Sequence, residues 1–214
     1  MKIQSLGYRT DLTNRILEGS VVEDRGDHLV IRSPDNPTFW WGNFLLIPEL
    51  KPGQAAGWLE RFAAEFPDAG HVVIGVDETD SAAIDPAELI AAGLELSSNT
   101  VLTAGGLKPP PRPNTEAVFR TLDGDDDWRQ AARLRAAVSE GMAGSDPEFL
   151  RARLQGERAM IEKGGGSWFG AFLDGELASQ LGIVPDASTG LARYQNVETR
   201  PSARRRGLAG TLVW

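Results

Sequence analysis

The segment "GGLKPPPRPN", residues 105–114, constrains the fold of this chain more than any other stretch. Two glycines are followed by prolines at positions 109, 110, 111 and 113. Proline lacks the backbone N–H that a helix interior or a central strand requires, so the run favours an extended, polyproline-like connector. We therefore predict a linker at residues 105–114, between a domain at residues 1–104 and a second one at residues 115–214.

The first half alternates between patterns typical of strands and of helices. Residues 39–48, "FWWGNFLLIP", are apolar almost throughout and predict a strand buried on both faces. Trp58, Phe62 and Phe66 recur every four residues and predict a helix. Further strands are expected at residues 28–34, 71–77 and 94–104, and a further helix at residues 85–93. This alternation predicts an α/β half-domain with some parallel pairing.

The second half predicts a different order of elements. A strand at residues 117–122 is followed by a helix at residues 125–141, whose acidic residues lie at its start, where the helix dipole favours them. Asp146 and Pro147 are typical of a helix start and predict a second helix over residues 145–166. Next are expected a hairpin that turns at Asp174-Gly175, a strand at residues 190–199 and a helix beginning at Arg204.

Composition limits the classes of function. The net charge is −8, and residues 1–111 carry 16 acidic and 8 basic side chains, whereas residues 112–214 carry 14 of each. Such a chain lacks the basic face that nucleic-acid binding requires, so no nucleic-acid partner is expected. Neither a membrane-spanning run nor a signal-peptide pattern is visible, and we expect a cytoplasmic protein with no membrane partner. The absence of cysteine excludes disulfides, thiolate metal sites and a cysteine nucleophile.

Residues 204–210, "RRRGLAG", combine positive charge with missing side chains directly after a predicted strand. A helix start exposes unpaired N–H groups and attracts phosphate. We expect Gly207 to let a phosphate approach the backbone, and Ala209 and Gly210 to keep the first turn narrow. The three arginines can add charge-assisted hydrogen bonds. The lysine of a Walker loop is missing, so we predict a pyrophosphate cradle of another kind and call residues 204–210 the signature segment.

The spacing of Arg204, Gly207 and Ala209, R-x-x-G-x-A, resembles the acyl-CoA signature (Q/R-x-x-G-x-G/A) of the GCN5-related N-acetyltransferase (GNAT) superfamily. Pro201 stands three residues before Arg204, as in the V-x-P-x-x-R run common in that family, with Thr199 where valine is usual. The order of elements over residues 115–214 is also similar to the first half of the family's fold. The resemblance implies an α/β fold with a mixed central sheet flanked by helices. It further implies transfer of an acetyl group from acetyl-CoA to a primary amine by direct attack.

The resemblance also implies which residues hold acetyl-CoA. Backbone N–H groups near Val197 and Thr199 would bind the pantetheine arm and polarise the thioester carbonyl. The pyrophosphate would lie on the signature segment, that is, on Arg204, Arg205, Arg206, Gly207, Leu208, Ala209 and Gly210. The family's base and acid are not assigned: Glu198 is the nearest ionisable candidate, but strand alternation puts it on the face opposite Val197 and Thr199. No metal is expected, because Asp125–Asp127 are interpreted as a helix start rather than a metal cluster.

The first half is itself similar to the second half of the same fold. Its equivalent junction, "PELKPGQAAGW" at residues 48–58, lacks the R-x-x-G-x-G/A pattern. It looks like a degenerate acetyltransferase-like domain in a tandem protein, and a single acetyl-CoA site is therefore expected.

The sequence reaches Trp214 within the signature helix, so the second copy of the fold is incomplete in it. We expect either that the natural chain continues, or that strands of the first half or of a partner chain complete the sheet; completion by a partner chain would give a homodimer. The acceptor is expected to be a small-molecule amine. Two alternatives stay open: a non-catalytic acyl-CoA-binding or structural module, and a nucleotide-phosphate binder of another family.

Overall fold

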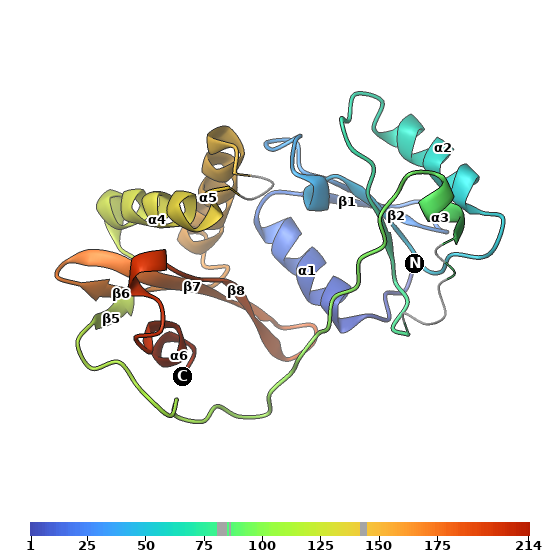
Figure 1. Ribbon diagram of the computed structural model, residues 1–214. Coiled ribbons are helices and arrows are strands. Elements are labelled where there is room, and N and C mark those ends of the chain that lie inside the picture. Colours follow the sequence, from blue (N-terminus) through green and yellow to red (C-terminus); the bar gives the residue numbers. More distant parts are fainter. Residues whose placement is uncertain (81–84, 86, 142–144) are drawn as a thin grey trace. The chain divides into compact units, whose positions relative to one another are not determined.

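Figure 1 shows the computed structural model, which describes residues 1–80, 85, 87–141 and 145–214. The chain divides into two compact units, Met1–Leu102 (unit 1) and Thr103–Trp214 (unit 2), and each contains its own four-stranded sheet. Within the described ranges, no helix has the length and apolar character needed to cross a bilayer.

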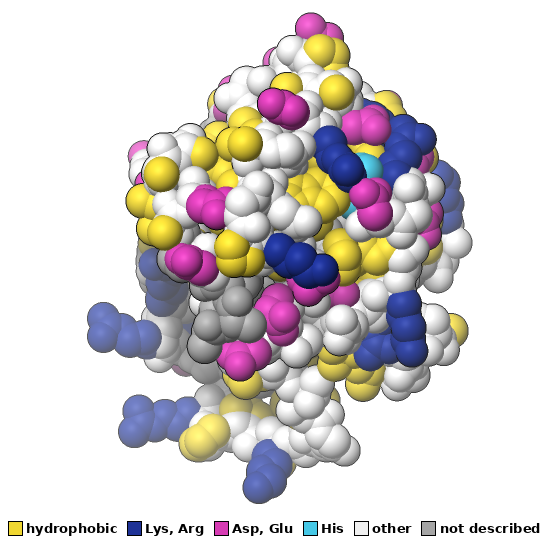
Figure 2. All heavy atoms as spheres, turned by 90° about the vertical axis from the view of Figure 1, so that its right-hand side faces the viewer, with side chains coloured by type: hydrophobic (Ala, Val, Ile, Leu, Met, Phe, Trp, Pro, Cys, Tyr) yellow, Lys and Arg dark blue, Asp and Glu magenta, His cyan; other side chains and the backbone are white. Residues whose placement is uncertain are grey.

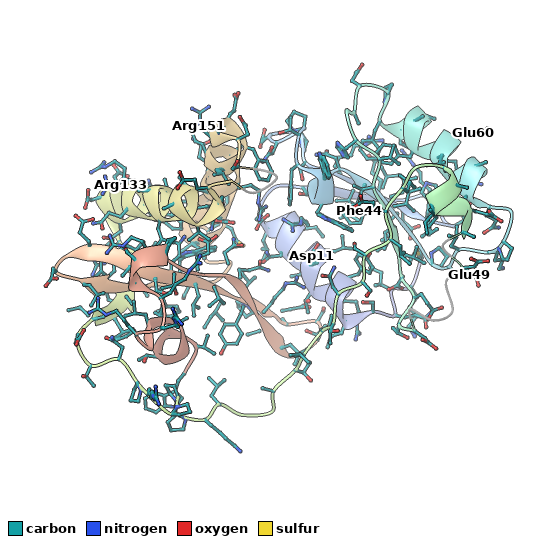
Figure 3. The ribbon with its side chains drawn as sticks, in the orientation of Figure 1. Asp11, Phe44, Glu49, Glu60, Arg133 and Arg151 are labelled. Atoms are coloured by element: carbon teal, nitrogen blue, oxygen red, sulfur yellow. The ribbon has the colours of Figure 1, made fainter. Side chains whose placement is uncertain are left out.

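Unit 1 is a mixed sheet with helices packed on both faces. It consists of α1 (Leu6–Leu17), β1 (Val21–Asp24), β2 (Leu29–Arg32), the 3₁₀ turn η1 (Trp40–Gly42), β3 (Phe44–Ile47), α2 (Ala55–Glu65), β4 (Ile74–Val76) and α3 (Ala87–Ala91). The strand order is β1-β2-β3-β4; the first three strands are antiparallel, and β4 runs parallel to β3. Leu12 of α1 packs on the face that carries Phe44, and Phe62 of α2 packs on the face that carries Leu45. All four residues of β3 are consequently buried, which confirms the predicted two-faced burial. Figure 3 shows Phe44 in the sheet and Asp11 on α1.

Three elements of unit 1 differ from the sequence-based predictions. The strand expected at residues 94–104 is wrong, because that stretch is irregular and almost wholly exposed. No strand of the described residues pairs with it, so its backbone groups are left to water. The helix α1, capped by Ser5, and the short strand β1 were not predicted.

On the face shown in Figure 2, acidic and basic side chains are interspersed with exposed apolar ones.

Unit 2 is built around an antiparallel sheet. Its elements are β5 (Val118–Thr121), α4 (Gly124–Ser139), α5 (Pro147–Glu162), β6 (Ser167–Leu173), β7 (Glu176–Asp186), β8 (Leu191–Thr199), the 3₁₀ turn η3 (Pro201–Ala203) and α6 (Leu208–Val213). The strand order is β5-β6-β7-β8, and every neighbouring pair is antiparallel. The helices α4 and α5 lie over one face of this sheet and α6 lies against the other (Figure 1).

The local signals in unit 2 are confirmed where they rest on caps and turns. Asp146 accepts a hydrogen bond from the Phe149 N–H at 2.8 Å and begins α5. Asp174 and Gly175 both have positive φ values, 51° and 83°, as the predicted two-residue hairpin turn requires. The signature helix, however, begins at Leu208 instead of Arg204, because Arg205 and Gly207 take left-handed conformations that a helix cannot contain.

The acidic run at the start of α4 is held by arginines. Asp125 pairs with Arg158, Asp126 with Arg129, and Asp127 with Arg120. Of the three carboxylates, Asp127 is the buried one, with its side chain 6% exposed. Hydrogen bonds from Arg120 lower the pKa of Asp127 below its usual value; burial partly opposes this effect, and the Asp123 N–H reinforces it.

We predict that Asp127→Asn makes the stability of unit 2 less dependent on pH. A carboxylate with a lowered folded-state pKa stabilises the fold above its unfolded pKa of about 3.9, and this contribution disappears as the pH falls through the folded value. Urea unfolding can be followed through the amide signals of α4. The free energy of unfolding of Asp127→Asn should be lower than that of the parent at pH 7, and the two values should become equal near pH 2. Asp126→Asn is the control, since its exposed pair contributes little. A constant difference between the variant and the parent at both pH values would contradict the prediction.

Candidate functional site

The signature segment is an irregular turn anchored at both ends in the core of unit 2. Ala203 and Leu208, which flank the turn, are each 2% exposed and pack with Ala171, Leu173 and Ala178 of the sheet. Between them, Arg205 has a φ of 62° and Gly207 a φ of 79°. Left-handed residues in such turns aim successive backbone N–H groups to one side, which is the geometry of backbone anion sites.

Asn114 fixes this turn from the end of the segment predicted as a linker. Its side-chain amide donates to the Arg206 carbonyl at 2.9 Å, and its backbone N–H donates to the Thr211 hydroxyl at 2.8 Å. Its side-chain oxygen Oδ1 accepts from the N–H groups of Glu116 and Ala117. Asn114 is 9% exposed. Sequence reasoning placed Asn114 in the linker and missed this role, since no local pattern joins residues so far apart in the chain.

Gly207 has a conformational role in this turn. A Cβ at this position would lie 2.4 Å from the Arg112 carbonyl oxygen and 3.2 Å from the Asn114 nitrogen. The space beside Gly207, expected to admit a phosphate, is therefore filled by the chain's own backbone. Gly210 is less confined, because its Cβ would meet only Pro110, at 3.3 Å.

The first turn of α6 presents three backbone N–H groups. The Thr211 N–H donates to the Gly207 carbonyl at 3.0 Å and is the first bond of the helix. The described residues offer no hydrogen-bond acceptor to the N–H groups of Leu208, Ala209 and Gly210. The side chain of Leu208 belongs to the core, so this residue can serve a ligand only through its backbone. These amides are available to an anion.

The three arginines of the signature segment have different surroundings. Arg206 pairs with Glu116, and Arg204 donates from Nε to the Thr199 carbonyl at 3.3 Å. Arg205 is exposed and forms no ion pair with the described residues. A pocket of about 200 Å³ is lined by Arg200 and by Arg133, which Figure 3 labels on α4. The Nε of Arg200 is buried and has no hydrogen-bond partner among the described residues. The remaining lining residues are Gln130, Leu134, Glu176 and Leu177.

The strand β8 is bulged where the sequence predicted a cofactor-binding edge. Gln180 pairs with Glu198 but Gly182 pairs with Gln195, so Asn196 and Val197 form a bulge. The Arg200 N–H donates to Ala178 of β7. Because N–H directions alternate along a strand, the N–H and C=O of Thr199 point to the other edge, with which no strand of the described residues pairs.

Comparison with known proteins identifies the fold. No protein-family model and no curated protein matches the sequence. A solved GCN5-related N-acetyltransferase from Kribbella flavida superposes with a TM-score of 0.56 at 15% identity, over 97% of this chain and 78% of its own. The chain has the GNAT fold.

Two further solved structures align over parts of the chain only. A ribosomal-protein-alanine N-acetyltransferase from Brucella melitensis biovar Abortus 2308 is 20% identical over 45% of this chain, with a TM-score of 0.34. A protein described as a GNAT-family acetyltransferase from Novosphingobium aromaticivorans is 25% identical over 51%, with a TM-score of 0.31. The aligned regions span 66% and 40% of these two proteins, respectively.

Glu198, the ionisable residue nearest to the β8 bulge in this GNAT fold, is already bound on both carboxylate oxygens. Arg135 of α4 donates from Nε at 3.3 Å, and the Gln180 side-chain amide donates at 2.5 Å. A general base needs a lone pair within reach of the proton that it abstracts. These contacts favour a structural role for Glu198 and leave the base and acid unassigned.

Unit 1 treats its corresponding junction differently. The parallel strands β3 and β4 are joined by α2, and the turn before α2 contains Gly53 with a φ of 80°. The carboxylate of Glu88 on α3 accepts hydrogen bonds from the N–H groups of Gly53 and Ala55. A side chain of unit 1 thus occupies the anion position at the first turn of α2.

Metal binding finds no support at the acidic run. Within the described residues, no group of three or more histidine, aspartate or glutamate side chains is arranged to hold a metal ion.

We predict that Gly207→Ala destabilises unit 2 more than Gly190→Ala does. Gly190 also has a left-handed φ, 69°, but no atom of the described residues lies within 4 Å of its Cβ position. Gly190→Ala should therefore cost only the left-handed strain of about 1–2 kcal/mol, whereas Gly207→Ala must also displace the Arg112 carbonyl. Urea unfolding of both variants measures the two free energies. Equal losses would show that the approach of Arg112 does not constrain the turn.

Proposed function

We propose that the protein is an N-acetyltransferase of the GNAT superfamily that binds acetyl-CoA at the signature segment and transfers the acetyl group to a primary amine. The observation that carries this proposal is the R-x-x-G-x-A motif placed, within a GNAT fold, on a turn with three unpartnered N–H groups. The pyrophosphate would bind the amides of Leu208, Ala209 and Gly210, with Arg204 to Arg206 around it.

The thioester would lie along the free edge of β8. Its carbonyl oxygen would accept from a backbone N–H near Val197 or Thr199, which stabilises the negative charge that develops during attack. The amine nitrogen bonds to the carbonyl carbon, the C–S bond breaks, and the proton that the amine loses balances the one that the thiolate gains. Holding both reactants in one orientation is worth up to about 7–11 kcal/mol of barrier in favourable cases.

The proposed acceptor is a small-molecule amine in the cytoplasm. The excess of acidic side chains in residues 1–111 favours a cationic acceptor over nucleic acid.

A second candidate function is acyl-CoA binding without chemistry, and the contacts of Glu198 favour it. Both oxygens of this carboxylate already accept hydrogen bonds from Arg135 and Gln180, which favours a structural role over that of a base. Calorimetric titration with acetyl-CoA, CoA and ATP, followed by an acceptor screen, separates the possibilities. Acetyl-CoA binding with transfer supports the enzyme, and binding without transfer to any amine supports the second candidate. Binding of ATP alone would overturn both.

We predict that Arg205→Gln weakens acetyl-CoA binding more than Arg206→Gln. Arg206 is already paired with Glu116, whereas Arg205 has no ion pair among the described residues. Losing one charge-assisted hydrogen bond to phosphate costs about 1.5 kcal/mol, or roughly tenfold in Kd. Glutamine keeps the Cβ of each arginine, so the strain at the left-handed position 205 is unchanged. A larger loss for Arg206→Gln would reverse the assignment.

We predict that calorimetry finds one acetyl-CoA site per chain. The anion position before α2 in unit 1 is taken by Glu88, so the turn at Gly53 should bind no pyrophosphate. Arg205→Gln serves as the control: if the signature segment is the one site, this variant should weaken the binding of all the acetyl-CoA that the parent binds. Two equivalents of acetyl-CoA, one of them insensitive to this variant, would contradict the prediction.

A further inference from the structure

A network of buried charges joins the two helices over the unit 2 sheet to the bulged strand β8. Arg135 is 4% exposed and Glu157 is 1% exposed, which is rare for charged side chains. The network consists of Arg135 on α4, Arg153 and Glu157 on α5, Trp168 on β6, Gln180 on β7, and Asn196 and Glu198 on β8.

Arg135 is the central member. Its Nη1 donates to Glu157 at 2.6 Å, and its Nε donates to Glu198 at 3.3 Å. Burial disfavours the charged guanidinium, but the two carboxylates outweigh this effect and raise the pKa of Arg135. Arg153 also donates to Glu157, at 3.3 Å, so the two carboxylates of the network face two guanidinium groups.

The contacts of the network converge on the bulge. The Asn196 side-chain amide donates to Glu157 at 2.7 Å, and the backbone of Asn196 is left-handed, with a φ of 45°. Glu198 is bound by Arg135 from α4 and by Gln180 from β7. Val197, between these two anchored residues, is 47% exposed. The network thus fixes the bulge on both sides of the residue that faces outward.

Stability alone does not account for such a network. Burying two ion pairs costs desolvation that an apolar cluster of the same volume avoids, so buried pairs are weak contributors to stability. Their value is geometric, because each bond defines a direction. Here the defined directions belong to the backbone on either side of Val197.

We propose that Arg135 and Glu157 are positioning residues that hold the β8 bulge so that the backbone N–H groups at Val197 and Thr199 face the reacting carbonyl. The inference rests on the proposed acetyl transfer. In this proposal Glu198 holds β8 in place through its ion pair with Arg135, and it takes no proton from the substrate.

Glu157→Gln tests the proposal. The parent must bind acetyl-CoA and transfer its acetyl group; failure there would overturn the proposed function and is seen before any variant is made. In an active parent, Glu157→Gln should lower kcat about 10- to 100-fold, the scale of a misplacement of about 1 Å, and leave KM for acetyl-CoA within about twofold. Glu162→Gln is the matched control, because this residue lies on the same helix in an exposed pair with Arg158 and should change neither constant.

Three further measurements separate positioning from other roles. Asn196→Gly removes the contact to Glu157 while allowing the left-handed backbone, and it should reproduce the fall in kcat even if Glu157→Gln folds poorly. Arg135→Lys should retain more activity than Arg135→Met, because it keeps the cation. The amide NMR shifts of Val197 and Thr199, recorded without ligand, should move in Glu157→Gln and stay fixed in Glu162→Gln.

Two results would overturn the proposal. One is an unchanged kcat in both folded Glu157→Gln and Asn196→Gly. The other is a Glu198→Gln variant that loses the acidic limb of the pH–rate profile together with more than about 10³-fold of kcat, since this behaviour belongs to a general base. A positioning role predicts a smaller loss and an unchanged pH profile.

Discussion

The conformation of the signature segment depends on one buried side chain, Asn114. Its amide satisfies the Arg206 carbonyl, and its backbone N–H satisfies Thr211, so the chain is held on both sides of Gly207. Gly207 can accommodate the close approach of this part of the chain only because it lacks a Cβ and takes a left-handed φ. The three N–H groups that follow are fixed in place before any ligand arrives. A site organised in advance binds an anion without the entropic cost of ordering a loop.

The two units differ in what accepts hydrogen bonds from the N–H groups at a helix start. Each has a turn with a left-handed glycine before a helix, and each helix start exposes N–H groups that need an acceptor. In unit 1 the Glu88 carboxylate supplies that acceptor from within the fold. In unit 2 the described residues supply none to Leu208, Ala209 and Gly210. The difference is one carboxylate, and it accounts for why a single unit is proposed to bind the coenzyme.

The sequence could predict those parts of the fold that depend on contacts between residues close together in the chain. Asp146 and the Asp174-Gly175 turn act through neighbours within three residues, so their patterns are visible in the chain itself. The strand expected at residues 94–104 failed because strand formation requires a partner, and no sequence window shows whether one is present. The sequence pattern drew attention to Gly207 as a phosphate-binding residue, but it could not show that the Arg112 carbonyl fills the space beside it, since Arg112 is distant in the chain and adjacent in space.

The same distinction applies to the candidate site. The motif spacing located the signature segment, because a glycine and an arginine at fixed positions are local features. The network of Arg135, Glu157 and Glu198 could not be found in this way, since its members come from two helices and a strand. Strand alternation separated Glu198 from Thr199, but it could not identify what Glu198 contacts. Pairing across elements decides which charges are structural and which are available.

That pairing also explains how an acidic protein can offer a cationic site. Most of the arginines on α4 and α5 are neutralised by carboxylates of the same helices or of the sheet. Arg133, Arg200 and Arg205 have no carboxylate within ion-pair distance among the described residues, and Arg205 lies two residues before Gly207 in a turn that already has unpartnered amides. Net charge therefore says little about this site, because the excess acid lies in the first half of the sequence. A bound ligand interacts mainly with the charges that lie within a Debye length of it, about 8–10 Å. Around the signature segment the balance of these charges favours a phosphate-bearing ligand.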